Sequence, residues 1–160
     1  MTVRTKEQTF RWVRELVGEH CPDRLFPVAF WFTREKRSAG QAHFTKAGQP
    51  DGFSLSEHYV LNPYVTNREV KNTILHELAH LISPFREGHG PAWKANAMRL
   101  GVKPGIYLDR PFISGSWVCR CPQCKTRWFF YRTPKGRQYR CWRCAAPVTV
   151  RKSKPGRYVK

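Results

Sequence analysis

The sequence predicts an α+β protein, in which a main domain of helices and a small antiparallel sheet is followed by a smaller cysteine-rich module. Three observations lead to this prediction. Apolar residues recur at helical spacing in three segments, and aromatic and β-branched runs separated by turn residues lie between the first two segments. In addition, five of the six cysteines fall within 26 residues near the C-terminal end. The 160 residues suffice for one ordinary domain with a small satellite.

The first helix is expected over residues 5–20, because Phe10, Val13, Leu16 and Val17 share one face. Thr5 followed by Gln8 resembles a capping box at its start, and Pro22 ends it. Three strands are expected next, separated by turn-forming residues, at 26–33, 41–45 and 53–62.

A second helix begins at Thr66, where Glu69 completes another capping box, and it ends at Pro84. Its apolar face is formed by Val70, Ile74, Leu75, Leu78, Ala79 and Ile82. A third helix opens at Pro91, a favourable first helical residue, and runs to Gly101.

A Pro/Gly-rich connector without clear periodicity covers residues 102–116 and indicates a domain boundary. We therefore predict a main domain at 1–110, a cysteine-rich module at 111–152 and a short basic tail at 153–160. The tail is expected to be mobile.

Positive charge is concentrated in the C-terminal third. The net charge is +18, and residues 111–160 contribute +13 because all eleven acids lie at or before Asp109. Such a segment favours a polyanionic partner. Nucleic acid suits it best, because each Lys or Arg that neutralises a phosphate releases counterions and so increases the binding affinity. A membrane surface, or solubility alone, is the alternative explanation.

The composition indicates a globular protein inside the cell. No apolar run approaches the roughly 18 residues of a membrane span, and the charged N-terminus has no secretory signal pattern. We expect a location in the cytoplasm or nucleoid, or in the nucleus of a eukaryote, and no membrane partner. In that setting clustered cysteines indicate a metal site.

The stretch "HELAHLISPFREGHGPAW" at residues 76–93 holds the candidate for catalytic chemistry. Residues four apart on a helix differ by about 40° in direction, so His76 and His80 can bind one ion. Glu77 lies about 100° from His76, which suits a base acting on a water rather than a ligand. His89 follows the Pro84 turn and can supply the third ligand, with Glu87 and Asp109 as lesser candidates.

Three imidazoles with a fourth position kept for water are the ligand set of a catalytic zinc. The expected mechanism is that Zn²⁺ polarises the scissile carbonyl and a water, while Glu77 takes the proton and passes it to the leaving amine. The alternative is three ordinary surface or core histidines.

These residues resemble the SprT-like family of zinc metallopeptidases, the group that includes eukaryotic Spartan. The resemblance rests on "HELAHL" followed by "EGHGPAW", and on a downstream Cys-x-x-Cys ribbon. It implies a zincin-like metalloprotease domain, with His76, His80 and His89 as zinc ligands and Glu77 as the catalytic base. It also implies DNA-stimulated cleavage of DNA-bound proteins. We expect no counterpart of Spartan's long C-terminal tail with partner-binding motifs, and therefore no recruitment to replication or ubiquitin factors.

The cysteines form two Cys-x-x-Cys pairs separated by sixteen residues, which fits a zinc ribbon. The four expected ligands fill every coordination position, so this second zinc is expected to be structural: Cys121, Cys124, Cys141 and Cys144. The identity of the first cysteine ligand stays open, because Cys119 could replace Cys121. Cys21 is expected to be a small buried hydrophobe.

Cations and aromatic rings alternate around the cysteine pairs, a pattern typical of single-strand binding. The predicted nucleic-acid contacts are Arg120, Lys125, Arg127, Trp128, Arg132, Lys135, Arg137, Arg140, Trp142 and Arg143. The competing interpretation is that half or more of the aromatics fill the core of the ribbon or dock it on the main domain.

The sequence therefore predicts a zinc endopeptidase with one catalytic and one structural Zn²⁺, whose basic ribbon binds DNA, single-stranded or at junctions. Its substrates are expected to be proteins bound or crosslinked to DNA, and we expect a monomer. The first alternative is a non-catalytic, zinc-stabilised nucleic-acid-binding protein. The second is a protease for soluble proteins in which positive charge serves substrate choice.

Overall fold

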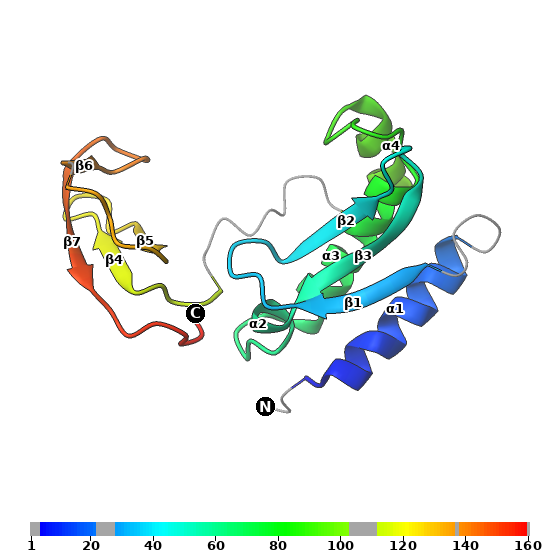
Figure 1. Cartoon of the computed structure of the whole chain (residues 1–160), viewed down its shortest axis with the longest axis horizontal. Helices are drawn as coiled ribbons and strands as arrows, with labels where there is room; N and C mark the ends of the chain where they lie inside the picture. The colour runs from blue at the N-terminus through cyan, green and yellow to red at the C-terminus, as the bar shows by residue number, and fades with distance from the viewer. Residues whose placement is uncertain (1–3, 22–27, 103–111, 137, 160) are drawn as a thin grey trace. The chain divides into compact units, whose positions relative to one another are not determined.

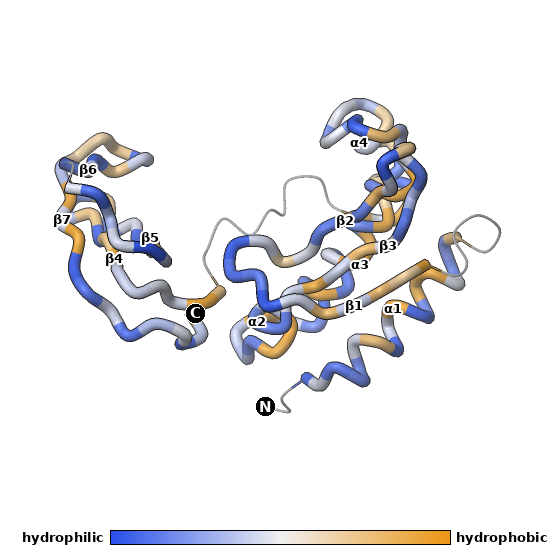
Figure 2. The backbone as a smooth tube through the Cα atoms, viewed as in Figure 1, coloured by the Kyte–Doolittle hydropathy of each residue, from blue (hydrophilic) through white to orange (hydrophobic). Residues whose placement is uncertain are grey.

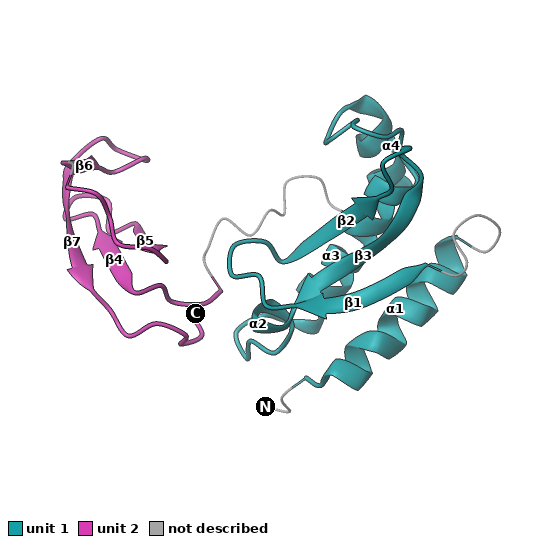
Figure 3. Cartoon of the chain, viewed as in Figure 1, with its two compact units in different colours: residues 1–107 teal, residues 108–160 magenta. Residues whose placement is uncertain are grey.

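The computed structural model describes residues 4–21, 28–102, 112–136 and 138–159. The chain divides into two compact units, an N-terminal unit at residues 1–107 and a C-terminal unit, the ribbon, at residues 108–160 (Figure 3). Most of the predicted connector, residues 103–111, lies outside the described residues. Within the part of the chain that the structure describes, no helix is long and apolar enough to span a membrane.

Helix α1 (Lys6–His20) opens the N-terminal unit, close to its predicted bounds. The side chain of Thr5 accepts a hydrogen bond from the backbone N–H of Gln8 at 3.1 Å, which satisfies one of the free donors at the helix start. The buried residues of the helix lie at helical spacing: Thr9, Trp12, Val13 and Val17.

A three-stranded sheet follows, with β1 (Ala29–Thr33), β2 (Gly40–Phe44) and β3 (Pro50–Ser56) in the order β1-β3-β2 (Figure 1). The α+β class is confirmed, and β2 pairs with β3 antiparallel as expected. The pairing of β1 with β3 is parallel, which differs from the all-antiparallel sheet we predicted. The chain reverses direction between β1 and β2 and again between β2 and β3, so β3 runs in the same direction as β1. Because β3 lies between the other two strands, its pairing with β1 is parallel.

The predicted third strand at 53–62 ends earlier, at Ser56, and continues as the short helix α2 (Glu57–Val60). Tyr59 and Val60 are consecutive and both fully buried. A strand with one solvent face would expose one of the two, whereas a helical turn buries both. Figure 2 shows hydrophobic residues along β1 and next to α2.

Helices α1 and α3 (Asn67–Leu81) cover the same face of this sheet. The ring of Phe10 on α1 contacts Phe30 on β1 at 5.6 Å between centroids. Phe30 is paired with Phe53, and Phe53 with Ala42, so these three residues share that face. A Cβ added at Gly40, which shares the face of Ala42, would meet the side chain of Glu77, and this contact places α3 over the β2 side of the face.

Helix α3 begins as predicted. The side chain of Thr66 accepts the N–H of Glu69, and the carboxylate of Glu69 accepts the N–H of Thr66, which completes the capping box. Of its predicted apolar face, Val70, Ile74, Leu78 and Ala79 are buried, whereas Leu75 and Ile82 are half-buried. The helix ends at Leu81, before Pro84. Helix α4 (Pro91–Arg99) has Pro91 at its start, as predicted.

The ribbon contains β4 (Trp117–Arg120), β5 (Arg127–Phe130), β6 (Tyr139–Arg140) and β7 (Pro147–Lys152). These strands form an antiparallel sheet in the order β5-β4-β7-β6. Its small core consists of three buried cysteines and one valine: Cys119, Cys121, Cys141 and Val148.

The segment predicted as a mobile tail instead pairs with the start of the ribbon. Ile113 forms an isolated antiparallel bridge with Tyr158. The N–H of Ser114 donates to the carbonyl of Arg157 at 2.8 Å, and the N–H of Val159 donates to the carbonyl of Phe112 at 3.2 Å. We call this pairing of residues 112–114 with 157–159 the clasp.

Candidate metal centres

Three histidine side chains of the N-terminal unit converge on one point. His76 and His80 come from α3, and His89 comes from the loop before α4. Their Nε2 atoms lie 3.2 Å apart for His76–His80 and 3.1 Å apart for the other two pairs. Three nitrogens bound to a tetrahedral zinc are separated by about 3.3–3.4 Å. The arrangement is therefore compatible with zinc binding.

The loop between α3 and α4 turns His89 back toward the helix. Arg86 and Gly88 have positive φ angles of 68° and 59°, and the N–H of Glu87 donates to the carbonyl of Pro84 at 3.0 Å. Gly88 adopts this left-handed backbone without the cost that a Cβ imposes. The reversal places His89 directly before α4.

Glu87, a lesser candidate for the third ligand, has a structural partner. Its Oε1 accepts the N–H of Ala92 at 3.0 Å, in the first turn of α4. A carboxylate at this position satisfies a free helix donor and complements the helix dipole. Asp109, the other lesser candidate, lies outside the described residues.

Two polar side chains tie the end of α3 to α4. The hydroxyl of Ser83 donates to the carbonyl of Ala79 at 2.6 Å. Asn96 of α4 donates to the oxygen of Ser83 at 3.0 Å and to the carbonyl of Ile82 at 3.3 Å. These bonds fix α4 against the helix that carries two of the three histidines.

Trp93 of α4 packs against all three histidine rings. Its centroid lies 4.7 Å from that of His76, 5.3 Å from His80 and 4.4 Å from His89. The residue is 1% exposed. Sequence reasoning placed Trp93 on the apolar face of its helix and missed this contact. The available signal was its position four residues after His89.

The environment favours the neutral form of the histidines, which is the form that binds metal. Burial, together with the neighbouring imidazoles, lowers the pKa of His76 to about 4. Burial and His89 lower the pKa of His80 to about 4 as well. Burial also lowers the pKa of His89.

Glu77 does not join the three histidines but points toward β2. It is 5% exposed, and its carboxylate accepts a hydrogen bond from the backbone N–H of Ala42. The side chain lies against Gly40, where an added Cβ would approach the Oε1 of Glu77 to 2.7 Å and its Cγ to 2.8 Å. The bare backbone of Gly40 thus provides the space that Glu77 fills.

Burial raises the pKa of Glu77 to about 8, although the N–H of Ala42 opposes the shift. A cation held by the adjacent histidines would favour the ionised carboxylate. A carboxyl group with a pKa near neutrality can both accept and return a proton, as a general base requires.

For the metal-free protein these shifts predict a pH optimum of stability near pH 6.5. The lowered pKa values of His76 and His80 stabilise the fold above about pH 6.5, and this contribution is lost as pH falls toward 4. The raised pKa of Glu77 stabilises the fold below about pH 4.5, and this contribution is lost as pH rises toward 8. Urea unfolding of the wild type and of Glu77→Gln across this range tests the second effect. The free-energy difference between them should shift in favour of the variant as pH rises, and a constant difference would contradict the prediction.

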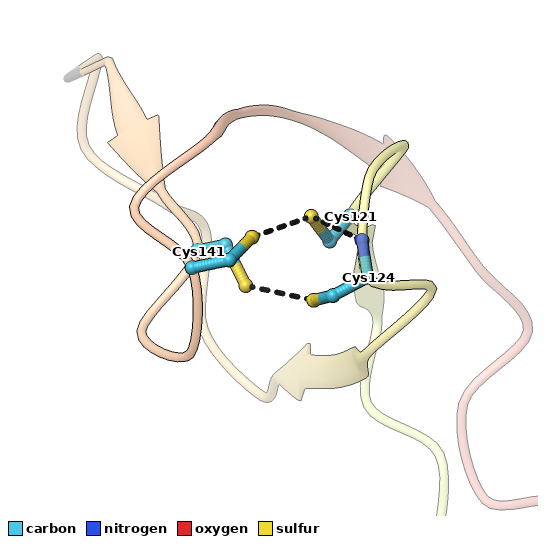
Figure 4. A group of neighbouring side chains, drawn as sticks. Cys121, Cys124 and Cys141 are labelled. Carbon is cyan, nitrogen blue, oxygen red and sulfur yellow. Dashed lines mark hydrogen bonds between the residues drawn. The ribbon is translucent and has the colours of Figure 1, made fainter.

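Four cysteines of the ribbon form the second cluster. The Sγ atoms of Cys121 and Cys144 lie 3.4 Å apart, and those of Cys124 and Cys141 lie 3.5 Å apart. Figure 4 shows the sulfur atoms of Cys121, Cys124 and Cys141 turned toward a common centre. Tetrahedral zinc–thiolate sites have sulfurs about 3.8 Å apart, so the cluster is compatible with zinc binding. Cys119 lies outside it, fully buried in β4 between Trp128 and Val150 of the neighbouring strands.

The two cysteine turns have the same backbone geometry. The N–H of Lys125 donates to the carbonyl of Cys121, and the N–H of Ala145 donates to the carbonyl of Cys141. Lys125 and Ala145 have positive φ angles of 61° and 58°. Hydrogen bonds with Thr126 lower the pKa of Cys124, which favours the thiolate that binds metal, whereas burial and the neighbouring thiols raise the pKa of Cys144.

The predicted nucleic-acid contacts divide into two groups. Trp128 packs against the ribbon core, as the competing interpretation held for half or more of the aromatics. By contrast, Trp142 is 65% exposed, between the cysteines of the second pair. Arg137 lies outside the described residues, and the remaining predicted cations are all exposed: Arg120, Lys125, Arg127, Arg132, Lys135, Arg140 and Arg143.

The fold and the histidine site define the class, an α+β protein whose H-E-x-x-H helix carries two of three histidines that are compatible with zinc binding. The model of the SprT-like family matches residues 7–110, well over half of the chain. The protein therefore belongs to the SprT-like family. No curated protein and no solved structure matches the chain.

Proposed function

We propose that the protein is a zinc-dependent endopeptidase that acts, in the presence of DNA, on proteins bound or crosslinked to DNA. The observation that carries the proposal is the convergence of His76, His80 and His89 on one point, with the buried Glu77 next to His76 on the same helix. Membership of the SprT-like family supports the peptidase class.

The proposed chemistry divides between the bound ion and the chain. When bound, zinc supplies a Lewis acid that polarises the scissile carbonyl and makes water more acidic. The three imidazoles, in their neutral form, would hold the ion. Glu77 would be the general base: its carboxylate would accept the proton of the attacking water and then deliver it to the leaving amine. The Ala42 N–H and the space at Gly40 keep this carboxyl in place.

The neighbouring strand β2 is suited to hold an extended peptide. It lies at the edge of the sheet and pairs with β3 on one side. An edge strand offers backbone donors and acceptors that can pair with a substrate strand. Because Glu77 packs against Gly40 and Ala42 of β2, a peptide at this edge would lie close to the proposed base.

The ribbon supports the DNA component of the proposal. Residues 111–160 carry thirteen Lys and Arg and no acid, and the described cations around the cysteine turns are exposed. Trp142 presents a large exposed ring next to Arg143, which suits stacking on an unpaired base. Binding one DNA molecule would bring the ribbon and a DNA-bound substrate together and raise the effective substrate concentration.

A cleavage assay with the full chain tests the proposal. A DNA-binding protein and a protein without DNA affinity serve as substrates, each with and without single-stranded DNA. DNA should accelerate cleavage of the first substrate and leave the second nearly unchanged. If six cations contact phosphates, DNA affinity should fall about 300-fold between 50 and 200 mM salt.

Other outcomes of this assay select other functions. Equal cleavage of both substrates without DNA would identify a general peptidase. Zinc and DNA binding with no cleavage of either substrate would identify a non-catalytic nucleic-acid-binding protein. A flat salt dependence of DNA binding would contradict the phosphate-binding role of the ribbon.

Gly40→Ala is expected to lower the cleavage rate about 100-fold while the histidine site keeps its metal. The new Cβ would lie 2.7–3.0 Å from three atoms of the Glu77 side chain, so the base must move. A displacement of about 1 Å can cost that factor in rate. Gly18→Ala is the matched control, because a Cβ there meets nothing within 4 Å. Equal rates for the two variants would show that Glu77 tolerates the shift.

A further inference from the structure

The indole of Trp93 is the largest fully buried side chain of the protein's described residues, and it is the one ring that contacts all three converging histidines. The centroid distances of 4.4–5.3 Å lie in the range of favourable aromatic pairs. The rings of His76 and His89 meet the indole at steep angles of 62° and 79°, whereas the ring of His80 is tilted by 33°. One buried indole therefore contacts three imidazoles at once.

Trp93 is itself held rigidly. It lies in the first turn of α4, which Glu87 caps at Ala92. The Asn96–Ser83 hydrogen bond then ties the same helix to the end of α3. The indole is thus fixed relative to the helix that carries His76 and His80, so its contacts can select the rotamers of their rings.

Hydrogen bonding does not explain the presence of a tryptophan at this position. Among the described residues, the buried Nε1–H of Trp93 has no hydrogen-bond acceptor. A buried donor without a partner is unfavourable, so a hydrocarbon side chain would suit the position better if filling space were its sole role. What the indole offers beyond volume is a broad π surface.

We propose that Trp93 is a positioning residue of the metal site, which orients the rings of His76, His80 and His89 so that their Nε2 atoms share one ion. Two effects contribute. Holding the rings in place before binding removes the entropic cost of ordering them. A bound dication also makes the imidazoles more positive, and an adjacent π surface favours positive charge.

The inference rests on the proposed function, in that the three histidines must hold a metal. The test is metal binding by the full chain, measured as zinc affinity by chelator competition and as the visible absorption spectrum of the cobalt-substituted protein. The variants are Trp93→Leu and Trp93→Met, which lack a ring, and Trp93→Phe, which keeps one. Phe53→Leu is the matched control, because Phe53 is also fully buried in the N-terminal unit and its ring contacts Phe30.

The ringless variants should bind metal at the histidine site ten- to a hundredfold more weakly, the usual cost of losing a group that orients a ligand. Their cobalt spectrum should change, Trp93→Phe should recover most of the affinity, and the ribbon should keep its metal with unchanged affinity as an internal reference. Phe53→Leu should lower the urea midpoint without changing either metal affinity.

Wild-type zinc affinity and cobalt spectrum in a folded ringless variant would overturn the inference and leave Trp93 a packing residue. The Met side chain fills space flexibly, so Trp93→Met decides the matter if Trp93→Leu does not fold. A different result would contradict the proposed function itself. If His76→Ala binds as much metal as the wild type, the histidines are not the ligands.

Discussion

Glu77→Gln is expected to lower kcat/KM for a DNA-bound protein by about 10²–10⁴-fold while the chain keeps two zinc ions. Glutamine has the shape of glutamate, and its amide oxygen can still accept the Ala42 N–H. The amide cannot accept and return a proton, however. Because Glu77 points toward β2 and lies outside the histidine cluster, its replacement should leave metal binding intact.

Single-turnover cleavage and metal content, measured on the same preparation, check this expectation. His80→Ala is the companion variant, since it removes a converging nitrogen from the same helix and should lose both cleavage and one zinc. Wild-type cleavage by Glu77→Gln would mean that another group takes the proton. Loss of zinc from Glu77→Gln would mean that the carboxyl supports the metal site directly.

Cys121→Ala should lower the metal content from two ions to one and unfold the ribbon, whereas Cys119→Ala should do neither. The two cysteines lie two residues apart and are both fully buried. Cys121 faces the sulfur of Cys144 at 3.4 Å, while Cys119 lies in the core of β4. A module with so small a core depends on its metal for stability.

DNA affinity should fall about 10–100-fold in Cys121→Ala, because the unfolded ribbon keeps its cations but no longer positions Trp142 for stacking. Cleavage of a short unstructured peptide, which needs no DNA, should persist in this variant. If instead Cys119→Ala loses the ion and Cys121→Ala retains it, Cys119 takes the place of Cys121 as a ligand.

The helices were predictable because their signals are local. Thr66 and Glu69 form a capping box within four residues, and Pro84 and Pro91 mark the end of one helix and the start of the next. His76 and His80 share a direction on any α-helix. The same local logic found the equivalent cysteine turns, whose spacing repeats in the sequence.

The direction of strand pairing and the clasp could not be predicted, since both depend on contacts between distant segments. The aromatic pattern of β1 is the same whether its neighbour runs parallel or antiparallel. The segment 153–159 pairs through backbone N–H and C=O groups, which every sequence has, while its basic side chains suggested a mobile tail. In α2, four residues are too few for a helical period to be recognised.

The surroundings of the histidine site could not be predicted from the sequence either. Gly40 gave no sign in the sequence that its missing Cβ makes room for a carboxyl 37 positions later. The sequence pattern indicated that Trp93 is an ordinary apolar residue of an amphipathic helix. Both depend on packing between elements, whereas the three histidines proposed as metal ligands follow from spacing along one segment.

The clasp has a consequence for the order in which the ribbon folds. It joins residues 45 positions apart, whereas the cysteine pairs that face each other are 17 and 23 positions apart. Shorter loops close at lower entropic cost, so we expect the cysteine centre to form first and to shorten the span that remains. The clasp should then close last and open first, and its local opening should leave the rest of the sheet intact. In hydrogen exchange, the clasp would be the least protected part of the ribbon and the cysteine end the most protected part.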